Sequence, residues 1–296
     1  MATVIGAIGS RSILGECPIW DYRTRHLTWV DIDGRHIYRW SWDADNLEVR
    51  AMDGRPGCIA LTTNPEILVV ASEHRIGLLD WVGGHVEWKL NLPIDQPSVR
   101  LNDGRVSPQG DLWIGSMHVP ATDRKSIGSI YRVDPDWSWE VRVTGVGVAN
   151  AMTTAGDGML WADTLLGCCW VLDPTGPADP VMSGDQAPLI DFAALGLPGG
   201  PDGACTDASG DLWVACVHGG ALAHLTAEGA LIERIDVPVR RPTCPAFGGP
   251  NLDTLFVTSI GGGDNYPTFD DEPDAGRVML IDVGVHGVPE NLFDAH

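Results

Sequence analysis

The sequence predicts an all-β fold: a single six-bladed β-propeller over residues 1–296. Two observations predict it. A strand-like segment recurs six times, and helical periodicity is nearly absent, the best candidate being a turn or two around Asp191–Leu195. The six segments are His26–Asp31, Glu66–Ser72, Gly110–Ser116, Gly158–Thr164, Gly210–Cys216 and Asp253–Ser259. Their aromatic or valine anchors stand at 29, 69, 113, 161, 213 and 256, so each step of 40 to 52 residues leaves room for four short strands.

Each unit has the same internal order of elements. A short strand and a turn precede the anchor strand, and the 36 Gly and 21 Pro of the chain suit many such turns. A third β-rich run follows each anchor: Arg35–Trp40, Gly77–Trp81, Ser129–Val133, Cys169–Leu172, Ala221–Leu225 and Arg277–Ile281. Because radial repetition leaves only short sheet edges exposed, we expect a closed ring, with Val4–Ile8 pairing with the last blade.

Composition limits the partners of the chain. Forty acidic and 19 basic residues give a net charge of −21, which opposes binding to nucleic acid or to anionic lipid. No apolar run is long enough to span a membrane, and the N-terminal segment lacks the pattern of a signal peptide. We expect a soluble cytoplasmic protein, a monomer or weak homo-oligomer, whose seven cysteines are reduced thiols.

Polar residues occupy one phase of the repeat. Asn102, Asn150 and Asp202 each lie eleven residues before the tryptophan of their anchor strand. The first unit has a longer hairpin, and a count of thirteen there reaches Glu16. The same count of eleven gives Cys58 in the second unit and Pro245 in the sixth. Residues at one phase of a cyclic repeat share a ring in space, so these side chains are expected to face a central channel.

The ring is a candidate cation site. Glu16 and Asp202 would repel each other when buried together, and a divalent cation would relieve that repulsion. Carboxylate and amide oxygens suit Ca²⁺, Mg²⁺ or Mn²⁺, and Zn²⁺ and Fe²⁺ also accept them, so the sequence leaves the ion open. Asn102 and Asp202 also stand in ordinary turn sequences, Asn-Asp-Gly and Pro-Asp-Gly. Turn residues have no reason to keep register with a distant strand, and the shared phase therefore favours the ring.

The chain resembles the SMP-30/gluconolactonase/luciferin-regenerating enzyme family, which are six-bladed propellers that include sugar lactonases. Five motifs in order carry the resemblance: Leu14–Pro18 with Trp29–Ile32, Arg100–Gly104 with Gly115–Met117, Asn150, Pro201–Gly203 with Leu212–Cys216, and Phe247–Gly249. The resemblance implies that Glu16, Asn150 and Asp202 bind one divalent cation. It also implies that Arg100 and Asn102 line the substrate pocket.

Two positions depart from the family pattern. Family members usually carry Gly after the ligating Asn, and here Ala151 follows Asn150. Where some relatives place acidic residues after Gly-Ser-Met, this chain has His118-Val-Pro. His118 is a further candidate for the substrate pocket. His218 also follows an anchor strand, and for both histidines a role outside the pocket is the alternative.

The predicted activity is metal-dependent hydrolysis of a neutral sugar lactone to the aldonic acid, with Asp202 taking the proton of the attacking water. Two alternatives use the same fold: a phosphotriesterase-like esterase, and a non-enzymatic calcium-binding propeller. Arg100 could instead pair with Asp103. The segments Pro120–Ser126 and Gly261–Pro267 are candidate lids.

Other catalytic patterns do not compete with this interpretation. The sequence has no Gly-x-Ser-x-Gly, His-Glu-x-x-His or nucleotide-binding glycine motif. Asp31–Gly34 begins like a calcium loop but lacks the closing Glu, so it is interpreted as a turn.

Overall fold

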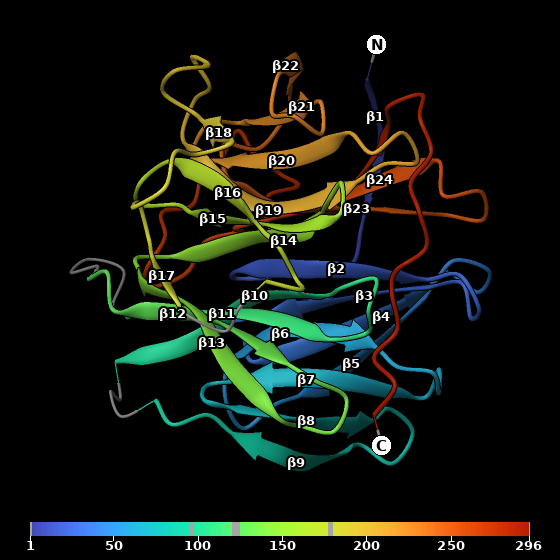
Figure 1. Cartoon of the computed structure of the whole chain (residues 1–296). Coiled ribbons are helices and arrows are strands. Elements are labelled where there is room, and N and C mark those ends of the chain that lie inside the picture. The colour runs from blue at the N-terminus through green and yellow to red at the C-terminus, as the bar shows by residue number, and fades with distance from the viewer. Residues whose placement is uncertain (1, 95–97, 120–124, 177–179, 296) are drawn as a thin grey trace.

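A computed structural model describes residues 2–94, 98–119, 125–176 and 180–295 of the chain. Six antiparallel sheets are arranged around a central axis, which confirms the predicted all-β, six-bladed propeller (Figure 1). The described residues contain no helix. The segment predicted as the best helical candidate is a turn with one hydrogen bond, from Leu195 N to Asp191 O at 3.0 Å.

The blades follow one another along the chain, and every predicted anchor and third strand is present. Blades one and two are β2 (Gly15–Asp21), β3 (His26–Asp31), β4 (His36–Ser41) and β5 (Asn46–Ala51), then β6 (Pro56–Leu61), β7 (Ile67–Ser72), β8 (Arg75–Asp80) and β9 (His85–Asn91). Blades three and four are β10 (Val99–Val106), β11 (Leu112–His118), β12 (Gly128–Val133), β13 (Trp139–Val146) and β17 (Val181–Met182), then β14 (Ala149–Ala155), β15 (Gly158–Asp163), β16 (Cys168–Leu172) and β18 (Ile190–Asp191). Blades five and six are β19 (Gly200–Thr206), β20 (Leu212–Val217), β21 (Ala221–Leu225) and β22 (Leu231–Asp236), then β23 (Pro242–Gly248), β24 (Thr254–Ser259), β25 (Val278–Asp282) and β1 (Thr3–Ile8).

The two ends of the chain close the ring. Strand β1 pairs antiparallel with β25, with Ile8 opposite Val278, as the sequence predicted. The C-terminal segment then leaves the sixth blade and runs along the molecule to the second blade, where the amide of Phe293 donates to Leu61 O at 2.9 Å (Figure 1). The sixth blade is therefore connected to the first blade through β1 and to the second blade through the C-terminal segment.

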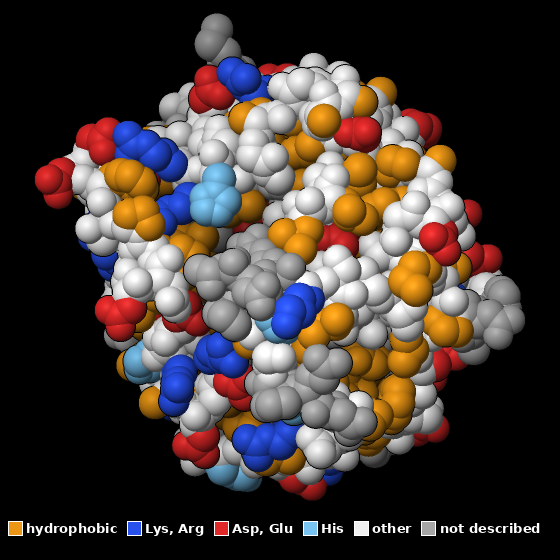
Figure 2. All heavy atoms as spheres, turned by 90° about the vertical axis from the view of Figure 1, so that its left-hand side faces the viewer, with side chains coloured by type: hydrophobic (Ala, Val, Ile, Leu, Met, Phe, Trp, Pro, Cys, Tyr) orange, Lys and Arg blue, Asp and Glu red, His pale blue; other side chains and the backbone are white. Residues whose placement is uncertain are grey.

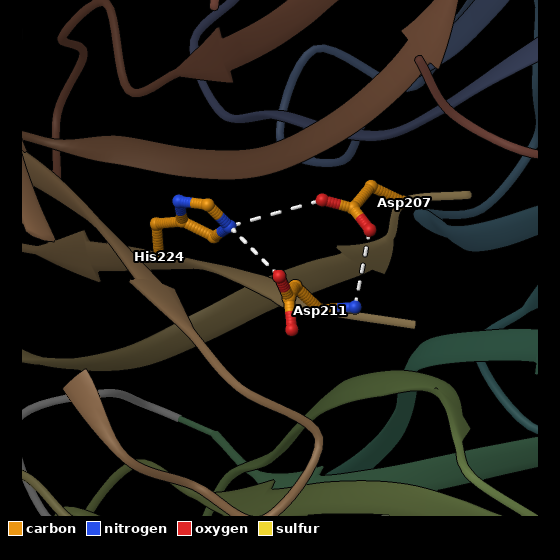
Figure 3. A group of neighbouring side chains, drawn as sticks. All are labelled: Asp207, Asp211 and His224. Atoms are coloured by element: carbon orange, nitrogen blue, oxygen red, sulfur yellow. Dashed lines mark hydrogen bonds and ion pairs between the residues drawn. The ribbon is translucent and has the colours of Figure 1, made fainter. Parts of the chain in front are cut away.

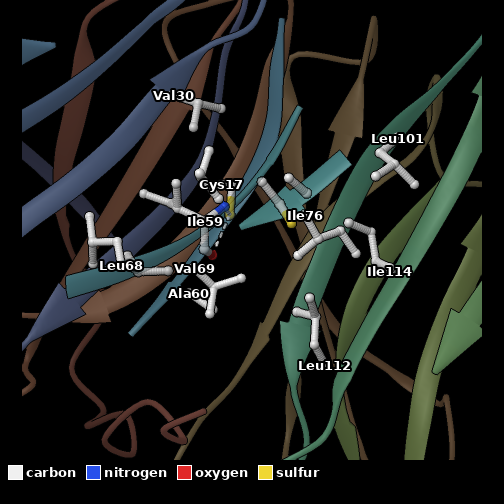
Figure 4. Packing of buried hydrophobic residues seen from close by; sticks show 14 of the residues in the cluster. Cys17, Val30, Ile59, Ala60, Leu68, Val69, Ile76, Leu101, Leu112 and Ile114 are labelled. Atoms are coloured by element: carbon white, nitrogen blue, oxygen red, sulfur yellow. Dashed lines mark hydrogen bonds between the residues drawn. The ribbon is translucent and has the colours of Figure 1, made fainter. Parts of the chain in front are cut away.

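Hydrophobic side chains fill the space between blades. The anchors Trp29, Trp113, Trp213, Phe256 and Val69 are all 0 % exposed. Figure 4 shows part of the largest cluster, in which side chains of the first three blades meet, among them Cys17, Ile59, Leu101 and Ile114. Burying each such aliphatic side chain stabilises the fold by about 1.5–3 kcal/mol, so this packing holds the inner strands in place.

Two further expectations can be set beside the structure. All seven cysteines are free thiols, and six of them are buried, as predicted for small buried hydrophobic groups. Within the described residues there is no helix of sufficient length and apolar character to cross a bilayer.

Candidate metal and substrate site

The inner strands are irregular where the predicted ring lies. In each of the six, the pairing with the next strand shifts register, as between Leu101 and Gly104 in β10 and between Pro201 and Ala204 in β19. Such bulges leave residues unpaired and re-aim their side chains. Asn102 and Asp202 lie inside these two bulges, which turns their side chains towards the channel.

Glu16 and Asn150 lie next to the bulges in their strands and not inside them. Each is paired, Glu16 with Val30 and Asn150 with Ala162, and the bulge begins immediately after it. The next residue in both strands has a left-handed backbone, with φ of 47° at Cys17 and 56° at Ala151. A non-glycine residue adopts this conformation at a cost of about 1–2 kcal/mol. This conformation is a physical reason for the glycine that the family resemblance leads one to expect at position 151.

Buried aspartates fix the backbone that leads into these two residues. Asp31 accepts hydrogen bonds from the amides of Ile13 and Leu14, both at 3.0 Å, two or three residues before Glu16. It also accepts from the Gly34 amide at 3.0 Å, which confirms that Asp31–Gly34 forms a turn.

The fourth blade repeats the arrangement. Asp163 accepts from the amides of Gly147 at 2.8 Å and Val148 at 3.1 Å, just before Asn150. Asp163 is 0 % exposed. In blades one and four, therefore, a buried aspartate that accepts from two consecutive backbone amides positions a polar side chain.

A row of hydrogen bonds connects the polar side chains of three blades. Arg100 Nη1 donates to Asn102 Oδ1 at 2.6 Å, and Asn102 Nδ2 donates to Asn150 Oδ1 at 2.7 Å. Asn150 Nδ2 in turn donates to Asp202 Oδ1 at 2.6 Å and to Thr164 Oγ1 at 2.9 Å. All four predicted residues in this row are at least 94 % buried. A change in any one of them is therefore transmitted to the others.

The alternative pairing of Arg100 with Asp103 is wrong. Arg100 makes no ion pair with any described residue, and its Nε has no hydrogen-bond partner in the part of the chain that the structure describes. Asp103 accepts instead from the amides of Gly104 and Met152, both at 2.9 Å, and burial raises the pKa of Asp103 to about 6. A buried guanidinium with a spare donor is suited to an incoming oxygen atom.

Glu16 adds a second buried carboxylate to the site. Burial raises the pKa of Glu16 well above its usual range, and the nearby charges of Asp202 and then Asp103 raise it further. Two carboxylates in one buried site are stable as anions only when a cation lies between them. The amide of Asn150 can present its oxygen to the same place by a half-turn. Glu16, Asn150 and Asp202 thus fit a hard divalent cation.

These residues line a single pocket, open to solvent, at one end of the channel. Glu16, Arg100, Asn102, Asn150 and Asp202 all face it. Its remaining wall is formed by Leu14, Ile32, Met117, Val148, Thr164, Val217, His218, Ile260 and Tyr266. In Figure 2, hydrophobic side chains lie in scattered groups over the face shown, and most acidic side chains lie towards its rim.

Some predicted residues lie elsewhere. Cys58 and Pro245, which share the count of eleven, do not line this cavity. His118 does not line it either: Arg100 pairs with Met117 across β10 and β11, so these two share a face, whereas His118 is opposite Val99. His118 is 4 % exposed, and its Nδ1 has no hydrogen-bond partner among the described residues.

The two candidate lids differ in what the structure describes. Residues 120–124 of the first lie outside the described residues. In the second, the amides and carbonyls of Gly263 and Tyr266 form a tight hairpin with hydrogen bonds of 3.0 and 3.1 Å. Tyr266 lines the cavity, which puts this segment at its mouth.

Sequence reasoning missed another group of potential ligands. Asp207, Asp211 and His224 of the fifth blade lie together, with one potential ligand atom from each within 4.8 Å of the others (Figure 3). The signal was present in the sequence, because His224 belongs to the third strand predicted next to the anchor of Trp213.

Comparison with known proteins places the chain among related sequences. Residues 14–261 match the family model described as the SMP-30/Gluconolactonase/LRE-like region. The chain is 33 % identical to a 6-deoxy-6-sulfogluconolactonase of Pseudomonas putida over 287 residues, which cover 95 % of each chain. It is 31 % identical to an L-arabinolactonase of Azospirillum brasilense, covering 96 % of this chain and 93 % of that one.

Solved structures agree with this placement. A luciferin-regenerating enzyme superimposes with a TM-score of 0.89 at 27 % identity, over 99 % of both chains. A protein described as a calcium-binding regucalcin, from Agrobacterium tumefaciens, superimposes with a TM-score of 0.84 at 27 % identity, over 96 % of this chain and 95 % of that one.

Proposed function

The chain belongs to the SMP-30/gluconolactonase/LRE-like family, and we propose that it hydrolyses a sugar lactone to the aldonic acid with the help of one divalent cation. Glu16, Asn150 and Asp202 hold the cation, and Arg100 and Asn102 hold the substrate.

The observation that carries the proposal is the composition of the cavity. Glu16, Asn102, Asn150 and Asp202 come from four different blades and face one space, in which two of them are carboxylates. Packing alone gives no reason to bury two like charges at one point. With a divalent cation the charges of Glu16, Asp202 and the ion sum to about zero, and a neutral lactone that enters beside them adds no net charge.

The relatives support the class of substrate. Two proteins at least 31 % identical over nearly the whole chain are named as lactonases, one for a sulfonated gluconolactone and one for L-arabinolactone. Both substrates are cyclic esters of polyhydroxylated acids. The cavity matches such a compound, since its polar residues lie among apolar ones such as Leu14, Ile32 and Val148.

The reaction needs water activation and stabilisation of a negatively charged oxygen. A divalent cation, when bound, polarises the ester carbonyl and lowers the pKa of a neighbouring water. Asp202 accepts the proton as the water oxygen attacks the carbonyl carbon. The bond between that carbon and the ring oxygen then breaks, and the ring oxygen receives the proton from Asp202 and becomes a hydroxyl group. The new carboxylic acid loses the second proton of the water to solvent, and the product leaves as a carboxylate.

Arg100 and Asn102 orient the substrate during this reaction. Arg100 lines the cavity, so its guanidinium can donate to a sugar hydroxyl or to the product carboxylate. Asn102 is held by Arg100 on one side and by the Ala149 carbonyl, at 2.9 Å, on the other. A fixed donor set of this kind places the ester carbon at the attacking water and keeps the ring from turning.

The test is a substrate panel with and without chelator. Xylono-, arabinono- and gluconolactone are compared with paraoxon, using full-length protein stripped with EDTA and then reloaded with Ca²⁺, Mg²⁺, Mn²⁺ or Zn²⁺. We expect turnover of at least one lactone, its loss on chelation and its return on reloading. Paraoxon turnover without lactone turnover would favour a phosphotriesterase, and no turnover on any ester would favour a binding protein.

A pair of variants assigns the activity to the cavity. Asp202→Ala should lower hydrolysis to less than about a tenth, because it removes both a ligand and the base. The matched control is Asp236→Ala, which removes an exposed carboxylate from the outer strand of the same blade and should leave turnover unchanged. Equal activity in the two variants would refute the role given to Asp202.

A further inference from the structure

The group Asp207, Asp211 and His224 lies at the other end of the fifth blade. Strand β19 carries Asp202 near its start, and Asp207 follows its last residue, five positions later. At about 3.3 Å per residue the two aspartates are separated by roughly 16 Å along the strand. Asp207 and Asp211 therefore belong to a region distinct from the cavity that holds Glu16, Asn150 and Asp202.

His224 points into this group without a hydrogen bond. Its Nε2 is 3.7 Å from Asp207 Oδ2 and 3.6 Å from Asp211 Oδ2 (Figure 3). These separations are too long for hydrogen bonds. Neither ring nitrogen has a hydrogen-bond partner among the described residues, although His224 is only 8 % exposed. A polar ring buried in this way needs a partner that the neighbouring side chains do not supply.

The third blade shows how the chain satisfies the equivalent position elsewhere. There Trp113 is paired with Arg132, and Arg132 Nε lies 3.1 Å from Asp111 Oδ2. In the fifth blade the corresponding tryptophan is paired with His224 instead. A permanent guanidinium charge in one blade is thus replaced by an imidazole in the other.

The fifth blade has an additional aspartate at the turn before the tryptophan, but the described residues place no arginine beside it. Position 207 carries an aspartate that is 2 % exposed, where the third blade has Ser107 at the same turn. Among the described residues, neither Asp207 nor Asp211 forms an ion pair with a lysine or an arginine. Two carboxylates with no fixed cation leave room for a bound one.

The distances from His224 to the two aspartates suit a metal ion of Zn²⁺ size, and all three ligand atoms lie within 4.8 Å of one another. At metal–ligand distances of about 2.0–2.2 Å, the ligand atoms of a tetrahedral site are roughly 3.3–3.5 Å apart. The two separations of 3.7 and 3.6 Å exceed this by a few tenths of an ångström, which small side-chain rotations would close.

The surroundings hold the ligands in place. Asp207 Oδ1 accepts from the amides of Ser209 at 2.8 Å and Asp211 at 3.1 Å, and its Oδ2 accepts from Trp213 Nε1 at 3.0 Å. The second ring nitrogen of His224 lies 3.9 Å from Glu233 Oε1, where a carboxylate can orient the imidazole towards the metal. Asp211 is about a quarter exposed, which leaves an entry path and a coordination position for water.

We propose that Asp207, Asp211 and His224 form a second cation site that binds a divalent first-row transition-metal ion such as Zn²⁺. An imidazole together with carboxylates favours such an ion over Ca²⁺ or Mg²⁺, whereas the oxygen ligands of the first cavity favour the hard ions. The second ion ties the β19–β20 turn to β21, and its role is to stabilise the fifth blade. The site neither depends on the proposed hydrolysis nor takes part in it.

The experiment counts bound Zn²⁺ in full-length protein. The chain is stripped with EDTA, dialysed against excess Zn²⁺ and then against metal-free buffer, and the metal per chain is measured by mass spectrometry. We expect two equivalents in the wild type, one in Asp202→Asn, one in His224→Arg and none in the double variant. His224→Arg reproduces the arrangement of Arg132 in the third blade, so it should fold. Asp211→Asn provides the same measurement if it does not.

A second readout follows the fold itself. Saturation of the site at a hundredfold excess over Kd should raise the melting temperature of Asp202→Asn by about 4 °C, and it should not change that of the double variant. Ca²⁺ at the same concentration should leave both unchanged. A single Zn²⁺ equivalent in the wild type that Asp202→Asn removes, or two equivalents retained in His224→Arg and Asp211→Asn, would overturn the proposal.

Discussion

Asp163 offers a direct test of how the propeller positions a ligand without touching it. Asp163 Oδ2 accepts from the Gly147 amide at 2.8 Å and from the Ser183 hydroxyl at 3.2 Å. Its Oδ1 accepts from the amides of Val148 and Leu165, both at 3.1 Å. In Asp163→Asn, one of the two oxygens becomes an NH₂ group. The less costly orientation turns that group towards Gly147, whose amide then faces another donor.

The size of the effect follows from these contacts. A charge-assisted hydrogen bond is lost and a buried amide is left without an acceptor, which together cost about 2–3 kcal/mol. For a chain of 296 residues the entropy of unfolding is about 0.6 kcal/mol per kelvin, so the melting temperature should fall by about 4 °C. Because the released backbone leads directly into Asn150, the affinity for the cation in the first cavity should fall about tenfold, equivalent to about 1.4 kcal/mol.

A destabilising variant far from the site provides the control. Phe293 is 0 % exposed and lies 5.2 Å from Trp137, ring centroid to ring centroid, where the C-terminal segment docks. Phe293→Ala should cost about 3–5 kcal/mol, or roughly 5–8 °C, through the cavity it leaves. It should leave cation affinity within about twofold of the wild type.

The assay is calorimetric titration of EDTA-stripped protein with Ca²⁺, which the second proposed site does not bind, together with thermal unfolding in EDTA. Loss of affinity in Asp163→Asn but not in Phe293→Ala separates positioning from general loss of stability. If Asp163→Asn melts about 4 °C lower but binds Ca²⁺ as the wild type does, Asp163 does not position Asn150 and the reasoning fails.

Three further outcomes are expected. Arg100→Ala should raise KM more than it lowers kcat in the lactone assay, and a fall in kcat alone would contradict a substrate-binding role. Glu290→Gln should lower the free energy of unfolding in urea by about 2–3 kcal/mol, because it leaves the buried Arg105 guanidinium, 2.5 Å from Glu290, without its counter-charge. Deletion of residues 2–8 should lower the melting temperature and promote aggregation by exposing the edge of β25, as sedimentation would detect; an unchanged monomer would argue against closure by β1.

In two blades, the length of the hairpin accounts for the number of residues between the polar side chain and its anchor tryptophan. The hairpin of the first blade has four residues between its strands, 22–25, and that of the fourth has two, 156 and 157. This difference of two accounts for the counts of thirteen and eleven in these two blades. The hairpins of blades three and five have five residues, 107–111 and 207–211, and still give eleven, because Trp113 and Trp213 are the second residues of their strands and Trp29 and Trp161 the fourth of theirs. The repeat and the loop lengths are local properties, so the sequence alone was enough to bring these residues to one end of the channel.

The same count failed for Cys58 and Pro245 because bulges are not encoded in spacing. Asn102 lies inside a bulge and Asn150 just before one, although both are eleven residues from their tryptophans. Equal spacing therefore does not give equal side-chain direction. The position of each bulge depends on how the inner strand packs against its neighbours, a tertiary property that a single sequence does not display.

Strand pairing carries information that could have been used for the histidines. Once β10 and β11 are aligned, Arg100 faces Met117, and alternation puts His118 on the other face. The same reasoning applied to β20 and β21 places His224 beside Trp213 and the acidic turn before it. Residues opposite each other across a hairpin are as informative as residues at one phase of the repeat, and they reveal sites away from the central channel.

The three ligands proposed for the first cavity, Glu16, Asn150 and Asp202, come from blades one, four and five, so no blade carries the complete set. The ligands meet only when the ring of blades is closed. The ring is closed by the β1–β25 pair, by the bridge between Leu14 and Ile260 in the cavity wall, and by the docking of Phe293 on the second blade. A cation bound by three blades in turn favours the closed ring, because it binds the folded chain and not the unfolded one. In the second proposed site all three ligands come from one blade, so its ion makes no direct link between blades. The two proposed sites therefore differ in their dependence on the closed ring. Cation binding in the first cavity requires closure of the whole propeller, and cation binding in the second site does not.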